Sequence, residues 1–413
     1  GINTLGTLTE GTTGGTVSAT SVSTIYYGQS ITFTANPASG YTFVGWFNSS
    51  DTSVGTGATY TASEVKANIS GIYAKFVTTP LTGVSANVGT VKGGTAKVDT
   101  SKYSGEVTGW FAGYNMTISA SATTGYTFKG WYEAEACSGT AVSTSASYTF
   151  KLSADTNKAY YALFELNSYS VSAVTQFKTA TSSNTLPASY STGTTGGTVS
   201  GTGTFTHGTK VTLTASANTG YTFVGWFTSA SATSASGTGT TYTISSLTGA
   251  TTMYARFEQT KYTVTIKAFY QAPASATTLG SLTLGTTGGT LSGSFALSNS
   301  NGTYTVSVYH GVSITFTATP ATNYQIAGWY STGDCTGTSL GTSATLARTI
   351  SGTSTFSVKF VAKAYALSLA VRYRSATSAT ALGDIATDTT GIAGTVTGAG
   401  SYKYGASVTI NAT

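Results

Sequence analysis

The amino-acid sequence predicts an all-β protein built as a tandem array of small domains, and three observations support this prediction. An aromatic octet, GYTFVGWF, occupies residues 40–47 and returns unchanged at residues 220–227. Apolar or aromatic residues alternate with polar ones along most segments, which is the period-two pattern of a strand, and no segment keeps the period of a helix. Glycines and an Asn-Pro pair interrupt these alternating runs as turns do. We therefore expect β-sandwich or β-grasp-like units joined into an elongated rod.

The composition is typical of a folded, exported chain. With 413 residues the chain exceeds one ordinary core, while 40% hydrophobic and 12% aromatic residues suffice for several. Only 8% of the residues are charged, so Ser, Thr, Asn and backbone groups must form most of the polar surface that contacts water. The net charge of +6 comes from scattered Lys and Arg residues, which argues against a nucleic-acid partner. No apolar run reaches the roughly 18 residues of a membrane span, so none is predicted.

Looser copies of the octet, GYTFKGWY from Gly125 and NYQIAGWY from Asn323, give the chain a regular spacing. The octet tryptophans recur 85, 95 and 103 residues apart, and they are Trp46, Trp131, Trp226 and Trp329. This is the spacing of domains and is too long for one turn of a solenoid. The predicted units are repeat 1 at residues 1–78, repeat 2 at 79–165, repeat 3 at 166–259, repeat 4 at 260–361 and a partial repeat 5 at 362–413.

Each unit is expected to contain the same strands in the same order. A Tyr-rich opening strand is predicted at residues 169–174, 262–270 and 365–373. A glycine turn leads to a short strand at residues 11–17, 193–199 and 285–291, and an alternating strand follows at 29–35, 210–215 and 312–318. After the octet, a Thr- and Ser-rich strand precedes the closing strand at residues 73–76, 161–164, 254–257 and 357–360. Repeat 1 lacks an opening strand, and residues 77–94 show no clear one for repeat 2.

The octet is predicted to form the repeated core of each unit. One large buried aromatic side chain per unit would stabilise so small a domain strongly, so we expect the four octet tryptophans to be structural. In a plainly alternating strand, Phe43 and Trp46 lie on opposite faces. The glycine before each tryptophan would let a backbone or a ring approach closely. These glycines are Gly45, Gly130, Gly225 and Gly328.

The aromatic residue that follows three of these tryptophans is a candidate for surface contacts. Tyr132, Phe227 and Tyr330 could stack on a glycan or contact a host protein. Strand alternation also favours the alternative, in which they pack on the second face of the strand.

The two cysteines occupy one equivalent position. Cys137 and Cys335 each stand six residues after their octet tryptophan. A rod would hold them too far apart for an intrachain bridge, so free thiols and interchain cross-links are the alternatives.

No catalytic, metal-binding or cofactor-binding site is predicted. The two histidines, His207 and His310, are too few for most acid–base or metal sites, and we expect them to be solvated in matching turns. The stretch GTFTHGTK at residues 203–210 imitates a phosphate loop, but it reverses the Gly-Lys-Thr order and runs into a strand instead of a helix. An enzyme is therefore not expected.

The order of these motifs resembles a known family. A Gly-Thr-Val turn, an alternating strand, the pattern G-Y-x-F-x-G-W and a closing Y-A-x-F strand are similar to the bacterial Listeria–Bacteroides repeat, including the divergent internalin-B B-repeat group. The resemblance covers nearly the whole chain. It implies small β-rich modules strung in tandem on secreted bacterial surface proteins, and hence an extracellular location.

The units are expected to be joined stiffly. The closing Phe precedes the opening Tyr by five residues at the junctions 164–169, 257–262 and 360–365. Links this short leave little freedom between neighbouring units. The first junction differs because it contains Pro80, and a bend is expected there.

The leading functional hypothesis is a non-enzymatic extracellular structural protein, either a stalk or the subunit of a fibre. Its partners would be neighbouring repeats and other copies of the chain. The alternative is an adhesin that binds a host protein or a glycan through exposed aromatic residues. Both ends fall inside a repeat, so we expect either a segment of a longer array or a unit end that accepts a strand from another molecule.

Overall fold

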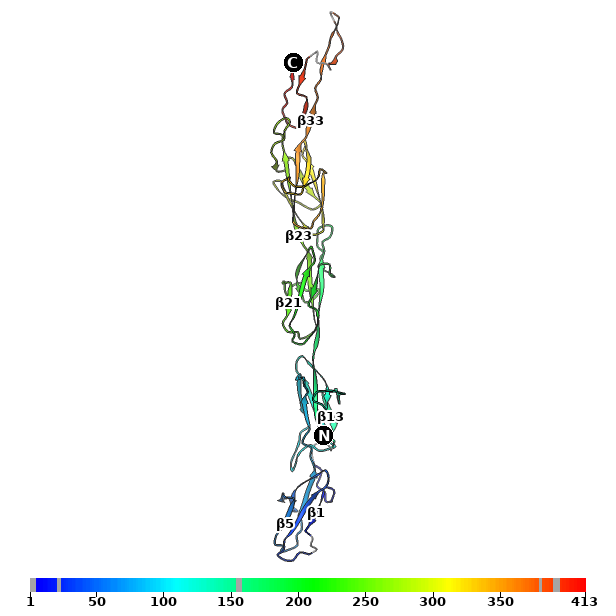
Figure 1. The fold of residues 1–413 in the computed structure, drawn as a ribbon, viewed down its shortest axis with the longest axis vertical. Helices are drawn as coiled ribbons and strands as arrows, with labels where there is room; N and C mark the ends of the chain where they lie inside the picture. The colour runs from blue at the N-terminus through cyan, green and yellow to red at the C-terminus, as the bar shows by residue number, and fades with distance from the viewer. Residues whose placement is uncertain (1–4, 21–23, 154–157, 379–380, 389–393) are drawn as a thin grey trace. The chain divides into compact units, whose positions relative to one another are not determined.

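The computed structural model describes residues 5–20, 24–153, 158–378, 381–388 and 394–413, and every regular element in these ranges is a β-strand (Figure 1). The all-β tandem array predicted from the sequence is therefore confirmed. The chain divides into two compact units. The first comprises Gly1–Tyr169, Phe205–Thr209 and Ser246–Gly249, and the second comprises Ser170–Thr204, Lys210–Ser245 and Ala250–Thr413.

Repeat 4 shows the plan of a complete repeat, which is two small sheets on one core. In the first sheet the closing strand β32 (Ser354–Ala362) is central. The octet strand β29 (Tyr324–Tyr330) pairs antiparallel with one edge of β32, and the opening strand β23 (Lys261–Gln271) pairs parallel with the other. The second sheet is antiparallel and consists of β25 (Gly289–Gly293), β28 (Ser313–Pro320) and β31 (Thr345–Thr349), with β28 in the middle.

Side chains from alternate positions of the strands fill the space between these sheets. Val264, Ile266 and Ala268 of β23 are fully buried, and Trp329 and residues of the second sheet join them in one cluster. Successive side chains of a strand point to opposite faces, so each strand gives one row to this core. The remaining strands of the repeat are β24 (Thr283–Leu284), β26 (Ser298–Ser300), β27 (Thr303–Tyr309) and β30 (Ser339–Gly341).

Repeat 3 follows the same plan. Its closing strand β22 (Thr251–Gln259) lies between the octet strand β20 (Tyr221–Phe227) and the parallel opening strand β15 (Ser168–Lys178). Its second sheet consists of β17 (Gly197–Ser200), β19 (Val211–Ala217) and β21 (Thr241–Ile244). Two further short strands are β16 (Ser191–Thr192) and β18 (Gly203–Thr206).

Repeat 2 has an opening strand that the sequence pattern did not reveal. The strand β7 (Ser85–Val88) pairs parallel with the closing strand β14 (Ala159–Leu166), so the expectation of no clear opening strand is wrong. β7 spans only four residues, so its alternation of Ser and Asn with Ala and Val is too short to stand out in the sequence. The other strands of repeat 2 are β8 (Gly94–Val98), β9 (Tyr103–Ser104), β10 (Thr108–Gly109), β11 (Asn115–Ala122), the octet strand β12 (Tyr126–Tyr132) and β13 (Ser147–Lys151).

Repeat 1 contains both sheets but no paired opening strand among its described residues. Its sheets have the orders β1-β2-β5 and β4-β3-β6. The closing strand β6 therefore forms a sheet edge. The strands are β1 (Gly15–Ala19), β2 (Ile31–Pro37), β3 (Tyr41–Phe47), β4 (Ser53–Gly55), β5 (Thr59–Ala62) and β6 (Tyr73–Thr78).

Repeat 5 forms only two-stranded pairings in the part of it that the structure describes. The pairs are β33 with β39, β34 with β37, β35 with β36 and β38 with β40. Their bounds are β33 (Ala364–Leu367), β34 (Val371–Tyr373), β35 (Ala376–Ser378), β36 (Ala381–Leu382), β37 (Ala386–Asp388), β38 (Val396–Thr397), β39 (Gly400–Lys403) and β40 (Asn411–Ala412).

A β-bulge interrupts every octet strand, so the plain alternation expected there is wrong. In repeat 1 the register against the closing strand shifts between Phe43 and Gly45, and the same shift recurs in repeats 2, 3 and 4. The extra residue at the bulge, Val44, shifts the alternation of the following side chains by one residue. Phe43 and Trp46 thereby reach the same face, where their ring centroids are 5.6 Å apart.

The glycine in each bulge faces a close neighbour. A Cβ on Gly45 would lie 2.9 Å from the carbonyl oxygen of Gly55, and one on Gly225 would lie 2.9 Å from that of Gly237. The approaching group is thus a backbone carbonyl. In repeat 2 the Cβ of Ala141 would lie 3.0 Å away from a Cβ on Gly130, and in repeat 4 the nearest atoms to Gly328 belong to Tyr330.

Candidate functional site

The octet tryptophans lie inside the repeats and offer no surface for a ligand. Their exposed fractions are 2% for Trp46 and 0% for Trp131, Trp226 and Trp329. Three indole N–H groups donate to backbone carbonyls of the loop that precedes the Thr- and Ser-rich strand: Trp46 to Gly57, Trp226 to Gly239 and Trp329 to Ser343, at 2.8–3.0 Å. A fifth tryptophan, Trp110, is 4% exposed, and the repeat pattern did not single it out.

The candidate surface aromatics do not form an exposed platform. Phe227 is 4% exposed, so of the two alternatives for this ring the surface contact is wrong and packing on the second face of the strand is what the structure shows. The guanidinium of Arg256 covers its ring at 3.9 Å, which is a cation–π contact. Tyr132 and Tyr330 are half-buried. The side of the octet strand that faces away from the core is therefore also packed.

Arg256 fastens the loop after the octet of repeat 3 to the closing strand. Its guanidinium donates to the carbonyl oxygens of Ala230 and Ala232 at 2.7 and 2.6 Å and to Oε1 of Gln176 at 3.0 Å. The ring of Tyr190 lies 4.7 Å away. A hollow of about 550 Å³ borders this group. Neutral acceptors and rings hold Arg256, which is only 6% exposed, so its role is structural.

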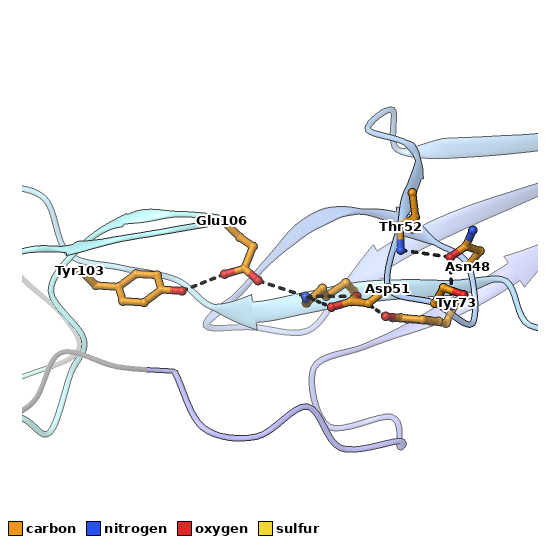
Figure 2. Close-up of polar contacts among 8 residues, drawn as sticks. Asn48, Asp51, Thr52, Tyr73, Tyr103 and Glu106 are labelled. Carbon is orange, nitrogen blue, oxygen red and sulfur yellow. Dashed lines mark hydrogen bonds and ion pairs between the residues drawn. The ribbon is translucent and has the colours of Figure 1, made fainter.

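Lys75 takes the equivalent position in repeat 1, where it builds a charged network with repeat 2. Its Nζ lies 3.3 Å from Asp51 Oδ2 in the loop after the octet and 3.0 Å from Glu106 Oε1, between β9 and β10. Figure 2 shows Tyr73 donating to Asp51, and Tyr103 donates to Glu106 Oε2 at 2.8 Å. The Lys75 side chain is 10% exposed, so the network is partly shielded from water.

The network is ionised over the ordinary pH range. The backbone N–H of Glu106, the Tyr103 hydroxyl and then Lys75 lower the pKa of Glu106 to about 2. The Tyr73 hydroxyl and then Lys75 hold the pKa of Asp51 below its usual value. Burial works against the ammonium, but the bonds to Glu106 and Asp51 outweigh it and raise the pKa of Lys75. Because the amine stays protonated and both acids stay charged, the group is an ion-pair clamp between two repeats.

The two histidines are docking residues, and the expectation of solvated turns is wrong. The backbone N–H of His310 donates to the carbonyl oxygen of Thr260 at 2.8 Å, and its ring lies 6.0 Å from Tyr262 and would collide with a Cβ on Gly220. His207 repeats this arrangement one unit earlier, against Gly125. The glycine of the preceding octet turn leaves the space that each ring fills, so both rings are half-buried.

The thiols are free and covered to different degrees. Cys137 is buried, its Sγ would collide with a Cβ on Gly89, and burial raises its pKa. Cys137 is therefore unsuited to an interchain cross-link in the folded chain. Cys335 is half-buried, and burial raises the pKa of this thiol too. No group of three potential metal ligands occurs among the described residues. No helix there could cross a bilayer.

The fold and these junctions define an all-β tandem-repeat protein. A family model described as the divergent InlB B-repeat domain matches residues 6–80, 84–168, 188–261 and 281–363. The chain therefore belongs to this family, and the resemblance read from the motifs is confirmed. Repeats of this family are associated with bacterial surface or extracellular proteins.

No curated protein matches the chain. Among solved structures, the Bacillus anthracis TIE protein aligns with 98% of this chain and 70% of its own, at 10% identity and a TM-score of 0.26. That score is too low to support an argument about fold or function.

Proposed function

We propose that the chain is a non-enzymatic extracellular spacer, in which repeats are locked to one another at a single linking residue. The observation that carries the proposal is a hydrogen bond that recurs at every junction. The residue after each closing strand donates its N–H to the carbonyl oxygen of the preceding octet turn: Thr79 to Gly40, Asn167 to Gly125, Thr260 to Gly220 and Lys363 to Asn323, all at 2.8 Å.

At three junctions the same residue also bonds the following repeat. The carbonyl oxygens of Asn167, Thr260 and Lys363 accept from the backbone N–H groups of His207, His310 and Tyr404, at 2.8–2.9 Å. One residue thus bonds the repeat before it through its N–H and the repeat after it through its C=O. Satisfying both groups fixes the backbone at the point where a flexible linker would otherwise be free.

The first junction uses different chemistry. Ala112 occupies the sequence position of the docking histidines. The N–H and C=O of Leu81, two residues after Thr79, bond the C=O and N–H of Trp110 at 2.6 and 2.8 Å and hold the linking segment to the rest of repeat 2. The ion pair between Lys75 and Glu106 adds a contact between repeats 1 and 2. A spacer needs each junction to resist bending, and both the backbone hydrogen bonds and the ion pair resist it.

Scattering from the full chain tests the spacer role. Strands of five or six residues span about 17–20 Å, and a two-layer unit with its turns should be about 30–40 Å long. Four and a half such units should form a rod roughly 130–180 Å long. A compact globule of this chain length would have a radius of gyration of about 22 Å. A near-spherical monomer would overturn the proposal.

A junction variant tests the mechanism. Thr260→Pro removes the N–H that bonds Gly220. We expect a shorter maximum dimension and a broader distribution of distances in this variant. Thr260→Ala keeps the N–H and loses only the bond between the Thr260 and Thr222 hydroxyls, so it should scatter like the unmodified chain.

Two exposed tyrosines favour a second candidate function, an adhesin. Tyr26 and Tyr27 are adjacent in a turn of repeat 1 and are 71% and 79% exposed. Tyr27 borders a hollow of about 530 Å³ with Phe33 and Val65. Exposed rings beside a hollow suit stacking on a sugar. Binding of the full chain to a glycan array, lost in Tyr26→Ala/Tyr27→Ala, would support this role, and an empty array would remove it.

A further inference from the structure

Arg256 fastens a loop of repeat 3, but its charge is not neutralised there. All three of its hydrogen-bond acceptors are neutral, since two are carbonyl oxygens and one is a side-chain amide oxygen. None of the ion pairs in the described part of the chain includes it. The carboxylate nearest in sequence, Glu258, lies 3.7 Å from Lys178 Nζ and accepts from the Tyr190 hydroxyl at 2.7 Å. Lys178, Arg256 and Glu258 therefore carry one net positive charge, although buried charges are ordinarily paired.

Hydrogen-bond donors also remain unused beside this charge. A guanidinium carries five N–H groups, and three of those of Arg256 have an acceptor. The Gln176 side chain accepts from Arg256 through Oε1, so its Nε2 has two N–H groups to donate. Nε2 has no hydrogen-bonded acceptor within the ranges that the structure describes, although Gln176 is only 5% exposed. Two donors of the guanidinium and two of the amide are thus free to bind a ligand.

These donors border a hollow that is large enough for a small ligand. Arg256 and Gln176 both line it, and its volume is about 550 Å³. Small-molecule sites in proteins commonly measure about 300–1,000 Å³. The opening strand β15 of repeat 3 is paired with the closing strand β22, so the hollow is a feature of a complete repeat.

Repeat 1 shows which group a cation at this position attracts. Lys75 is the equivalent of Arg256, and Asp51 Oδ2 lies 3.3 Å from its Nζ. The N–H of Asp51 bonds the carbonyl oxygen three residues earlier, and the N–H of Ala232 does the same in repeat 3. Ala232 therefore takes the place of Asp51 in this turn, and it lines the hollow. Repeat 3 has a methyl group where repeat 1 has a carboxylate, so the position of an anion is left open.

Other residues that line the hollow suit a ligand with several hydroxyl groups. Ser189, Ser231 and Thr233 line it, and all three are exposed. A hydroxyl group both donates and accepts, so each of these side chains can exchange hydrogen bonds with a hydroxyl group of the ligand. A carboxylate and several hydroxyl groups on one small ring are the chemistry of a sugar acid.

We propose that this hollow binds a sugar acid, with the carboxylate on Arg256 and Gln176 and the hydroxyl groups on the serine and threonine side chains of the lining. A carboxylate matches the planar fork of a guanidinium and forms charge-assisted hydrogen bonds with it. Such a ligand would neutralise Arg256 and satisfy the Gln176 amide at once. The site goes beyond the spacer role and does not depend on it.

Saturation-transfer NMR with the full chain tests the proposal, and free D-glucuronate is the probe. Glucuronate should bind, and its titration gives a dissociation constant. D-Glucose has a CH₂OH group in place of the carboxylate and should bind at least about tenfold more weakly, because it makes no charge-assisted hydrogen bond. N-Acetylglutamate carries carboxylates without sugar hydroxyl groups and should also bind at least about tenfold more weakly.

Gln176→Glu tests the charge without changing the size of the side chain. Its carboxylate would neutralise Arg256 and remove the amide donors, so the affinity for glucuronate should fall about tenfold or more. The hydrogen-exchange protection of β20 and β22 should be unchanged or higher, which separates loss of the ligand from misfolding. Ala232→Asp places a carboxylate where Asp51 stands in repeat 1 and should lower the affinity in the same way. The matched control, Ser234→Asp, adds the same charge at an exposed residue of the loop outside the hollow and should keep the affinity within about threefold.

The outcomes separate the binding site from the spacer role. Glucuronate that binds the unmodified chain no better than glucose would overturn the site, and so would an affinity that survives both Gln176→Glu and Ala232→Asp. An equal loss in Ser234→Asp would show attraction to the net charge of the chain and would also overturn it. N-Acetylglutamate that binds as tightly as glucuronate would overturn the assignment to a sugar acid. A rod that binds no glucuronate would leave the spacer role intact.

Discussion

Replacing Trp226 by alanine removes the largest side chain from the core of repeat 3. The indole is 0% exposed, its ring centroid lies 5.5 Å from that of Phe223 and 6.0 Å from that of Tyr242, and its N–H bonds Gly239. A buried tryptophan hides about 150–250 Å², which at about 25 cal/mol per Å² corresponds to about 4–6 kcal/mol. Alanine retains a little of this, so a loss of about 3–5 kcal/mol is expected for the repeat.

The assay must report on repeat 3 alone, because repeats in an array unfold with some independence. Hydrogen exchange followed by mass spectrometry gives the free energy of opening for peptides from β19, β20 and β22. Trp226→Phe, which keeps a ring but loses the N–H donor, should cost about 1–3 kcal/mol. Thr222→Ala, at an exposed position of the same strand, should change stability by less than about 0.5 kcal/mol. If Trp226→Ala changed the protection of repeat 3 no more than Thr222→Ala does, the octet would not be the core of the repeat.

Three further predictions follow from individual contacts. Gly225→Ala should destabilise repeat 3 by about 1–3 kcal/mol, measured by the same exchange experiment, because its Cβ would lie 2.9 Å from a carbonyl oxygen, whereas Gly239→Ala meets nothing nearer than 3.7 Å and should cost less. The pKa of Glu106 is about 2 in the folded chain against 4.5 ordinarily, so its contribution to the first junction should be complete above pH 4.5 and lost as the pH falls toward 2. Because that side chain is 33% exposed, the contribution should stay near or below about 1 kcal/mol, and an equally acid-sensitive Glu106→Gln variant would contradict this assignment. Alkylation with iodoacetamide at neutral pH should label Cys335 before Cys137, since Cys137 is the more buried; equal rates would show that the loop after the octet opens freely.

The sequence alone was sufficient for the class of fold and the order of its parts. Period-two alternation and glycine turns are local signals, and they correctly indicated strands at the opening, alternating, octet and closing positions of repeats 3 and 4. The recurrence of one octet also identified the family, because a repeated motif carries the same information several times. The predicted boundaries of the repeats and the rod shape stay predictions.

Tertiary structure decided which face each side chain occupies. A bulge of one residue moved Trp46 onto the face of Phe43, and the alternation of letters cannot show such an insertion. The sequence left Phe227 either as a surface ring or as a ring packed on the second face of its strand, and the guanidinium of Arg256, which comes from another strand, covers it. The four-residue strand β7 is recognisable as an opening strand only from its parallel pairing with β14.

The junctions depended most on tertiary structure. Lys75 and Glu106 belong to different repeats, and nothing in either local sequence pairs them; Figure 2 shows Glu106 reaching the network of Asp51 and Tyr73. His207 and His310 resemble solvated turn residues when their own turns are read alone, since the glycine that receives each ring lies in the preceding repeat. The sequence by itself determined strands, repeats and family, because these depend on neighbours along the chain. The packing of rings and the contacts between repeats depend on distant segments of the chain, so only the folded structure could decide them.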